Sequence, residues 1–290
     1  MPMEQDVRSS NISRNPYHIE DQAPTLRLSV FVLMDILGYS EMIGRSQEAG
    51  KQQEMLRKLH QVLTKGRDWL EGKELFLSSE KSLKKDDFAL KAFTDNIVIG
   101  WPVLDDAESE FGSAFFKLAY FQFQMVLEGF FVRGALSVGE AYVDEITVFG
   151  SALVEAYAGE AELARDPRII LTSSAVKTAK KHLKYYKNPR TAPHVRDVLR
   201  DSDGQWFINY LDCILIAEDE QGPFYEDFTK HKTIVENKLA EYKSNPGIWS
   251  KYAWVAGYHN YFCDLHSRYF NDEHRINVEL FRASPALIVE

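Results

Sequence analysis

The apolar run from Leu26 to Met34 is the feature that most restricts how this 290-residue chain can fold. The run reads LRLSVFVLM, ends at Asp35, and is followed three residues later by Gly38. A short stretch that is apolar at consecutive positions fits a strand covered on both faces, and it is much shorter than the roughly 20 apolar residues of a membrane-spanning helix. We therefore expect a buried strand that presents a carboxylate at its end.

The order of the remaining segments predicts an α+β fold. Segments with apolar residues at helical spacing alternate along the chain with short apolar runs typical of strands. Tight turns join several of these runs. The expected helices are 48–71, 106–128, 150–163 and 174–183, and the expected strands are 88–93, 97–101, 131–139, 141–143, 169–171 and 206–210. This order predicts a largely antiparallel sheet covered by helices.

Three regions of the chain differ in character. Residues 1–25 are polar, contain Pro16 and Pro24, and are typical of a flexible arm. Residues 26–215 contain the alternating helices and strands, and residues 216–290 form a mostly helical extension with an aromatic band at 249–262. In this band His259, Cys263 and His266 fall at helical spacing, which suits either a soft-metal site or a packed aromatic helix.

Composition excludes several classes of protein. The 34 Lys and Arg against 43 Asp and Glu give a net charge of −9, which disfavours nucleic-acid binding. The two cysteines, Cys213 and Cys263, provide neither a disulfide framework nor a CxxC motif, so a reducing compartment is expected. Residues 1–25 lack the apolar core of a signal peptide, and the most apolar long stretch, 114–131, is interrupted by polar residues. We expect a cytoplasmic protein with no nucleic-acid or membrane partner.

Two carboxylates follow strand-like runs at positions where they can converge. Asp35 ends the first buried run, and Asp95 lies in the turn Thr94-Asp95-Asn96 between two later strands. Two carboxylates on adjacent strand ends can hold divalent cations against a triphosphate. Each residue has a simpler interpretation, because Asp35 could cap the following helix and Asp95-Asn96 is common in turns.

A third segment completes a resemblance to a known family. The segment FFVRGALSVGE (130–140) resembles the strand-turn-strand of class III nucleotidyl cyclases, and ITVFG (146–150) resembles the segment that leads into that family's catalytic helix. Together with MDILGYS (34–40), FTDN (93–96) and VFGSALVEAY (148–157), they look most like the bacterial pyrimidine cyclases of the Pycsar anti-phage systems. The resemblance covers roughly residues 28–172 and implies a ferredoxin-like cyclase core, with the helical extension outside it.

The resemblance also implies a two-metal site. Asp35 and Asp95, with the carbonyl of Ile36, would bind two Mn²⁺ or Mg²⁺ ions, and the ribose 3′-hydroxyl would attack the α-phosphate and expel pyrophosphate. Arg133 is a candidate catalytic residue, although it could equally be a strand arginine paired with a local carboxylate. The backbone amides expected to bind the triphosphate are those of Leu37, Gly38, Tyr39 and Ser40.

Base recognition is expected from Lys91 and Thr147, which occupy the family's base-reading positions. Lys91 can donate to uracil O2 or O4 and to cytosine O2, and a lysine facing the O4 edge would favour uridine. The alternatives are a solvated strand lysine and a β-branched filler. Members of the family act as homodimers with shared sites, so Asp35 and Asp95 would act with Thr147 of a partner subunit.

One departure from the family concerns the helix after Gly150. The family's purine cyclases carry an Asn and an Arg there, four residues apart, where this chain has Val154 and Ala158. We therefore expect conversion of UTP to 3′,5′-cyclic UMP, a messenger read by a separate effector in anti-phage defence. The alternatives are a cytidylate cyclase making cyclic CMP from CTP, a purine cyclase, and a degenerate cyclase domain that senses nucleotide without turnover.

Overall fold

The computed structural model describes residues 15–18, 23–70, 88–192, 194–215 and 222–278. Its strands are β1 (Arg27–Ile36), β2 (Ala89–Phe93), β3 (Asn96–Pro102), β4 (Val132–Val143), β5 (Val148–Phe149), β6 (Ile169–Leu171), β7 (Val198–Arg200) and β8 (Trp206–Ile208). Its longer helices are α1 (Tyr39–Glu48), α2 (Gln52–Leu70), α3 (Glu108–Leu127), α4 (Ser151–Glu162), α5 (Ser173–His182), α8 (Tyr225–Glu241) and α9 (Pro246–Leu265). The short helix α6 (His194–Asp197) and the 3₁₀ segment Tyr210–Leu215 lie between them.

A single open sheet organises the fold, in the order β2-β3-β1-β4-β6-β8-β7, with β5 paired to β4. The pairing of β4 with β6 is parallel, and the other strand pairs are antiparallel. Strand β1 lies inside the sheet, between β3 and β4, as its apolar sequence predicts. The expected α+β architecture, a mostly antiparallel sheet covered by helices, is confirmed.

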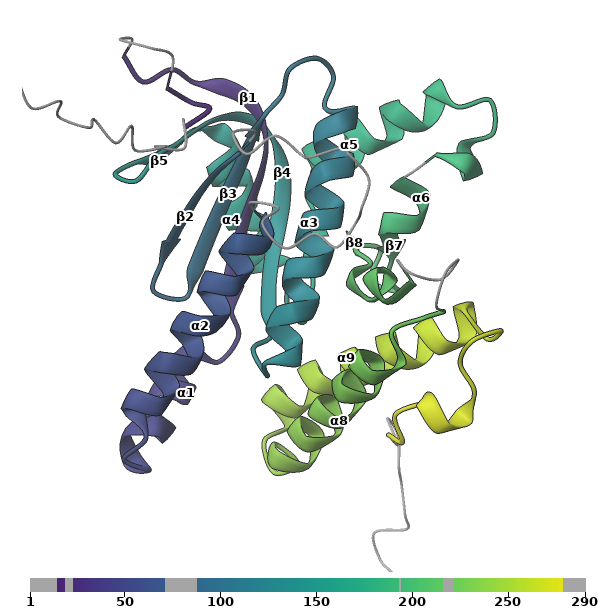
Figure 1. Ribbon diagram of the computed structural model, residues 1–290. Coiled ribbons are helices and arrows are strands. Elements are labelled where there is room, and N and C mark those ends of the chain that lie inside the picture. Colours follow the sequence, from purple (N-terminus) through teal and green to yellow (C-terminus); the bar gives the residue numbers. More distant parts are fainter. Residues whose placement is uncertain (1–14, 19–22, 71–87, 193, 216–221, 279–290) are drawn as a thin grey trace, which may run out of the picture.

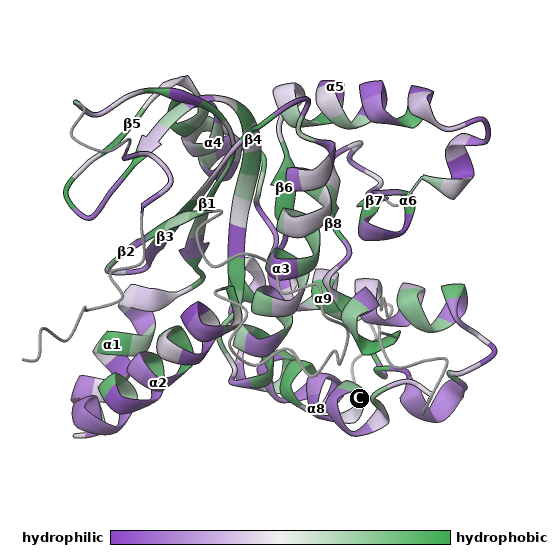
Figure 2. Cartoon of the chain, turned by 45° about the horizontal axis from the view of Figure 1, so that its top comes forward, coloured by the Kyte–Doolittle hydropathy of each residue, from purple (hydrophilic) through white to green (hydrophobic). Residues whose placement is uncertain are grey.

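Side chains of β1 alternate between two apolar layers, because successive residues of a strand point to opposite faces. Val30, Val32 and Met34 pack in the larger core, which includes residues of α2 and α3. Phe31 and Leu33 pack in a smaller core with Ala152 and Ala156 of α4. The helices α3 and α4 therefore cover opposite faces of the sheet (Figure 1), and the strands between them are largely hydrophobic in Figure 2.

The boundaries of several elements differ from the sequence-based expectation, most clearly at β4 and before α2. β4 runs without a break through 139–141, because Gly139 and Glu140 pair with Ser29 and Leu28 on the long neighbour β1. The helix expected from residue 48 is preceded by the separate helix α1. The break between α1 and α2 contains Gly50, whose φ of 66° is a conformation that glycine adopts readily.

Residues 15–18 pack on the sheet, so the expectation of a flexible arm is wrong for them. Tyr17 is fully buried, and its hydroxyl donates to Ser29 Oγ at 2.8 Å. Asn15 Nδ2 donates to the carbonyl of Val143 at 2.9 Å. Gly100 leaves the necessary space, because a Cβ there would lie 2.4 Å from the Tyr17 hydroxyl. The rest of the predicted arm up to residue 22 lies outside the described residues.

The C-terminal helices share the main core. Phe228 of α8 and Phe262 of α9 belong to the same buried cluster as α3 and the strands. Tyr258 of α9 donates through its hydroxyl to Asn209 Oδ1 at 2.6 Å and accepts from the amide of Leu211 at 3.0 Å. The predicted boundary at 216 falls at residues that are not described. No helix in the described part of the chain is long and apolar enough to cross a membrane.

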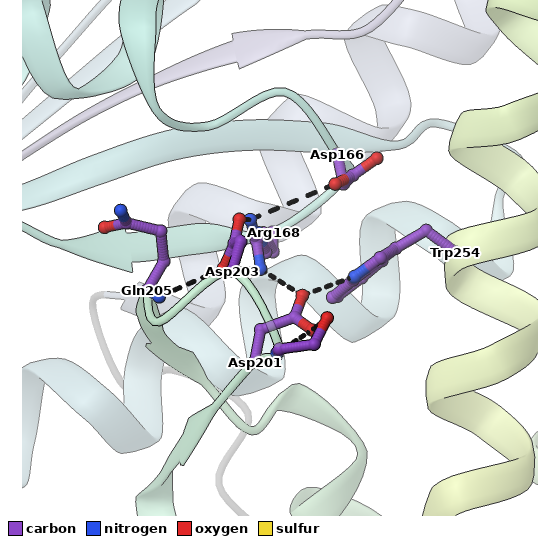
Figure 3. Close-up of polar contacts among 7 residues, drawn as sticks. Asp166, Arg168, Asp201, Asp203, Gln205 and Trp254 are labelled. Atoms are coloured by element: carbon purple, nitrogen blue, oxygen red, sulfur yellow. Dashed lines mark hydrogen bonds and ion pairs between the residues drawn. The ribbon is translucent and has the colours of Figure 1, made fainter.

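A buried arginine, Arg168, lies at the centre of a group of polar contacts between α9 and the edge of the sheet (Figure 3). The side chain of Arg168, just before β6, is fully buried and forms ion pairs with Asp201 and Asp203 on the β7–β8 connection. A longer ion pair of 3.9 Å joins it to Asp166. Trp254 of α9 donates from its indole nitrogen to Asp201 Oδ2 at 2.6 Å. These contacts connect three elements that are distant in sequence.

Candidate functional site

Asp35 and Asp95 converge at one end of β1. In the β1–β3 register Asp35 lies opposite Asn96, and the amide of Ile36 donates to the carbonyl of Asp95 at 3.0 Å. Burial is the main cause that raises the pKa of Asp35, and the nearby charge of Asp95 adds to the rise. The two predicted carboxylates therefore belong to one site.

The β2–β3 turn holds the Asp95 side chain in place. Thr94 adopts a left-handed conformation with a φ of 56°, which closes the tight turn. Thr94 Oγ1 lies 2.8 Å from Asp95 Oδ1, and Asn96 Nδ2 donates to the same oxygen at 3.2 Å. The second carboxylate oxygen of Asp95 is the one with greater freedom to accept a ligand.

Arg133 lies beside this pair of carboxylates. It stands opposite Asp35 in the β1–β4 register, and its Nε donates to Asp35 Oδ2 at 3.2 Å. Its Nη2 lies 2.8 Å from Oε1 of Glu160, a buried residue on α4, in an ion pair without the alignment of a hydrogen bond. The guanidinium thus bridges a strand and the helix that covers it.

The electrostatics of the site favour binding of cations. Burial raises the pKa of Asp35 above its ordinary value, Arg133 opposes this rise, and Asp95 adds to it. Burial likewise raises the pKa of Glu160, and Arg133 again opposes it. Asp35 and Glu160 contact the Arg133 guanidinium and Asp95 lies next to Asp35, so the fully ionised group of three carboxylates and one guanidinium has an excess of negative charge. A further cation, once bound, stabilises the ionised carboxylates.

The donor atoms of this site suit a hard divalent cation. Carboxylate and backbone carbonyl oxygens are the ligands that Mg²⁺ accepts, usually together with water and substrate phosphates. Within the described ranges, no group of three or more His, Cys, Asp or Glu side chains is arranged to hold a metal ion. Asp35 and Asp95 therefore need a carbonyl such as that of Ile36, and the ligand itself, to complete a coordination shell.

His259, Cys263 and His266 on α9 are likewise not among any group arranged to hold a metal ion in the described part of the chain. His259 hydrogen-bonds the ring of His231 at 3.0 Å and the carbonyl of His274 at 2.9 Å, so it belongs to a packed network. Cys263 is a buried free thiol. Of the two alternatives for this spacing, the structure has the packed aromatic helix.

The loop after β1 presents backbone amides at the start of α1. Gly38 has a φ of 73° and precedes the first helical residue, Tyr39. The amide of Leu37 donates to the carbonyl of Phe131 at 2.8 Å, so it already has a partner in the fold. The Gly38, Tyr39 and Ser40 amides remain as candidates for binding an anion at this helix start.

Lys91 and Thr147 come together at another part of the sheet. Lys91 Nζ donates to the carbonyl of Ile146 at 2.7 Å, next to Thr147, although the residues are far apart in sequence. The adjacent turn is held by Asp144, which accepts from the amides of Ile146 and Thr147. A hydrogen bond from Tyr142 is the main cause that lowers the pKa of Asp144 to about 2. The proposed base-reading residues are therefore neighbours.

Helix α4 leaves Val154 and Ala158 on its exposed side. Val154 is 69% exposed, and the neighbouring Tyr157 is 63% exposed. The helix is positioned by Gly150, whose φ of 132° requires glycine and whose Cβ would lie 2.1 Å from the Glu140 carbonyl oxygen. Val154 and Ala158 have no side-chain hydrogen-bond donor, which fits their sequence-based interpretation as a departure from the family.

Two further residues near the site were not identified from the sequence. Glu160 follows Ala152 and Ala156 on the buried side of α4, and a carboxylate at such a position is a signal that helical spacing could have provided. Lys251 on α9 is within the electrostatic reach of Arg133, Asp166 and Asp35, and burial is the main cause that lowers its pKa. No local signal connects Lys251 with Arg133 and Asp35, which lie more than a hundred positions earlier.

No protein-family model matches this chain, and no curated protein matches its sequence.

Proposed function

We propose that this protein is a pyrimidine nucleotide cyclase that converts UTP to 3′,5′-cyclic UMP and pyrophosphate with two divalent ions, Mn²⁺ or Mg²⁺. The observation that carries the proposal is the convergence of Asp35 and Asp95 beside Arg133. Isolated carboxylates at strand ends are common, but two that share a half-buried position with a bridging arginine form a site for phosphoryl chemistry.

The arrangement of the first four long strands supports the assignment to class III cyclases. Along the chain, β1 is followed by helices, the β2–β3 hairpin, α3 and β4, and these strands lie in the order β2-β3-β1-β4. This is the βαββαβ pattern of ferredoxin-like folds, to which the cyclase core of the resemblance belongs. The pattern alone does not specify a reaction, so the site residues carry the functional argument.

The ions would lower the pKa of the 3′-hydroxyl and neutralise the triphosphate charge. Asp35, Asp95 and the Ile36 carbonyl would hold the ions at the end of β1. The amides of Gly38, Tyr39 and Ser40 would orient the phosphates at the start of α1. Positioning of this kind supplies most of the catalysis in phosphoryl transfer.

Arg133 would stabilise negative charge that develops on the phosphate. It is fixed on β4 between Asp35 and Glu160, so it needs no large rearrangement to act. Val154 and Ala158 supply no donor, and Arg133, which contacts Asp35, would take this part. A donor aimed at developing charge typically contributes a factor of about 100 or more in rate.

We further propose that the active form is a homodimer with shared sites. Large apolar side chains are exposed on β2, the β4–β5 turn, β5 and α4, namely Phe93, Ile146, Phe149, Val154 and Tyr157. Exposed apolar side chains of this size are candidates for an interaction surface. A partner subunit covering this surface would bring its Lys91 and Thr147 toward the nucleotide held by Asp35 and Asp95.

Two alternatives remain in the same framework. A cytidylate cyclase would use the same ions and the same Lys91 contact to the base carbonyl. A nucleotide sensor without turnover is favoured by the exposed, donor-free Val154 and Ala158. In either case the biological setting that we propose is a cytoplasmic signal to a separate effector during phage infection.

A product assay tests the proposal. Purified protein with Mn²⁺ is incubated separately with ATP, GTP, CTP and UTP, and the products are separated by chromatography. We expect cyclic UMP from UTP, and no product with EDTA or with Asp35→Asn or Asp95→Asn protein. Cyclic CMP from CTP would select the cytidylate cyclase, and the absence of any cyclic nucleotide would select the sensor.

A further inference from the structure

A broad basic groove lies along α5, on a part of the sheet outside the Asp35–Asp95 site. It has a volume of about 1230 Å³, and its floor includes Val138 of β4, Leu171 of β6 and Trp206 of β8. The cations that line it are Lys177, Lys180, Lys181, Lys184 and Arg200. Among the described residues, its lining contains no Asp or Glu. Such a concentration of positive charge is unexpected in a chain with a net charge of −9.

The cations of the groove come from two separate elements. The lysines project from α5 and the turn that follows it, and Arg200 ends β7 on the other side. Lys180 Nζ lies 5.4 Å from the centre of the Trp206 ring, a cation–π contact that places this ammonium over the floor. The groove is therefore two-sided, unlike the face of a single lysine-rich helix.

The carboxylates nearest the groove have other partners or lie at its margin. A hydrogen bond with Tyr185 is the main cause that raises the pKa of Lys181, and the charges of Asp106 and Asp105 add to it. Glu155 accepts the amide of Ser174 at 3.0 Å at the start of α5. Lys177, Lys180, Lys184 and Arg200 are the other cations of the lining.

The spacing of the lysines sets the size of the anion. Residues 177, 180 and 184 lie within two turns of chain, and seven residues of helix span about 10 Å. This distance exceeds a single phosphate group and fits a chain of two or three linked phosphates. The Ser173 hydroxyl on the same wall adds a hydrogen-bond donor for phosphate oxygens.

We propose that this groove binds a linked di- or triphosphate group, either as inorganic polyphosphate or as the phosphate chain of a nucleotide. A long nucleic acid fits less well, because it would continue from the groove over the acidic remainder of the surface. The proposal does not depend on the reaction at Asp35 and Asp95, since it concerns different residues.

Binding of inorganic triphosphate in EDTA tests the proposal, because chelation removes the divalent ions that the Asp35–Asp95 site would need. We expect saturable binding by calorimetry that weakens with added salt. Lys177→Gln/Lys180→Gln/Lys184→Gln protein should bind on the order of tenfold more weakly or worse. The control Lys51→Gln/Lys65→Gln/Lys243→Gln changes three exposed lysines elsewhere and the net charge equally, and it should bind normally. Equal loss in both variants, or no binding by the unaltered protein at low salt, would overturn the proposal.

Four additional measurements separate the sources of the ligand, guard against misfolding of the variant, and distinguish this proposal from the proposed cyclase. Similar affinity for UTP and inorganic triphosphate in EDTA indicates recognition of the phosphate chain alone, whereas markedly tighter UTP binding indicates a nucleotide site. Much tighter binding of a single-stranded oligonucleotide would contradict the proposal and indicate a nucleic-acid surface. In the unaltered protein, triphosphate should protect Lys177, Lys180 and Lys184 from acetylation; the absence of protection would also contradict it. Asp35→Asn protein should retain triphosphate binding, which distinguishes failure of this proposal from failure of the proposed cyclase.

Discussion

Arg133 Nε lies 3.2 Å from Asp35 Oδ2, and the two residues stand directly opposite each other on adjacent antiparallel strands. The same guanidinium reaches Glu160 on α4, so the candidate site is built across the sheet and the helix that covers it. The arginine opposes the effect of burial on the pKa of Asp35, which keeps this carboxyl more acidic than burial alone would allow. The Arg133 side chain therefore both offsets the negative charge of Asp35 and Glu160 and connects the strand with the helix that covers it.

Replacement of Arg133 tests its role in the proposed reaction. We expect Arg133→Gln to lower kcat about 100-fold, the typical effect of losing a donor to developing charge. Loss of the guanidinium also raises the pKa of Asp35 further, so the acid limb of the pH–rate profile should move to higher pH. The pH dependence of kcat with saturating UTP and Mn²⁺ measures both effects.

A matched variant, Arg133→Lys, retains the charge but not the fork of donors. We expect it to keep the acid limb near that of the unaltered protein while recovering only part of the rate. An Arg133→Gln enzyme with unchanged kcat would show that another group stabilises the transition state.

Neutralising Asp95 separates function from stability. Burial is the main cause that raises the pKa of Asp35, and the like charge of Asp95 adds to the rise, so in the absence of metal Asp95 disfavours ionisation of its neighbour. Asp95→Asn should therefore abolish turnover while leaving the thermal midpoint unchanged or slightly higher. Thermal unfolding in EDTA and the product assay measure the two effects on the same sample. A large fall in the midpoint would mean that Asp95 serves mainly to hold the β2–β3 turn.

The convergence of Asp35 and Asp95 was predictable because both residues end apolar strands, and consecutive strands usually lie near each other in a sheet. The central position of β1 was predictable for a different reason, because a largely apolar strand fits a place where both of its faces are covered. Helix and strand types were predicted better than boundaries: the single strand β4 was expected as two, because its pairing with β1 is not visible in local sequence.

Contacts between distant segments were not predictable in this way. Tyr17 docks where Gly100 leaves room, and a polar, proline-containing segment gives no sign of such a partner. Lys251 comes near Asp35 only because α9 packs against the sheet edge through Trp254 and Asp201. These contacts depend on the tertiary arrangement, which periodicity and motif spacing do not encode.

The buried histidines predict loss of stability in acid. His259 donates from Nε2 to the carbonyl of His274, so its Nδ1 accepts from His231 Nδ1, and His231 Nε2 accepts from the Tyr210 hydroxyl. Burial holds the pKa of His259 at about 4 against an ordinary 6.5, and it lowers the pKa of His231 as well. Both rings are thus neutral in the folded protein at neutral pH.

The direction of the pH effect follows from these lowered values. Below pH 6.5 the histidines of the unfolded chain bind protons, whereas the buried rings of the folded protein stay neutral. As the pH is lowered, the free energy of unfolding therefore falls until the pH reaches the pKa of the folded state. For His259 alone the loss between pH 7.5 and pH 5 is about 2 kcal/mol. Urea denaturation at the two pH values measures it, and His259→Gln protein should show a smaller difference between them. An equal difference in the variant would assign the acid sensitivity to other groups.

Arg168 provides the sharpest test of the packing that positions α9. Its side chain is fully buried beside Asp166, Asp201 and Asp203, so Arg168→Met leaves these carboxylates without their cation. Removing one partner of a buried ion pair typically costs about 3–5 kcal/mol, and we expect a loss of this size in urea denaturation. Arg196, whose side chain is 56% exposed in its ion pair with Asp212, offers a control, and Arg196→Met should cost less than about 1 kcal/mol. Adding Asp203→Asn to Arg168→Met should recover part of the loss, because one unpaired charge is removed. If Arg168→Met protein were as stable as the control, the attachment of α9 would rest on its aromatic contacts instead of on this cluster.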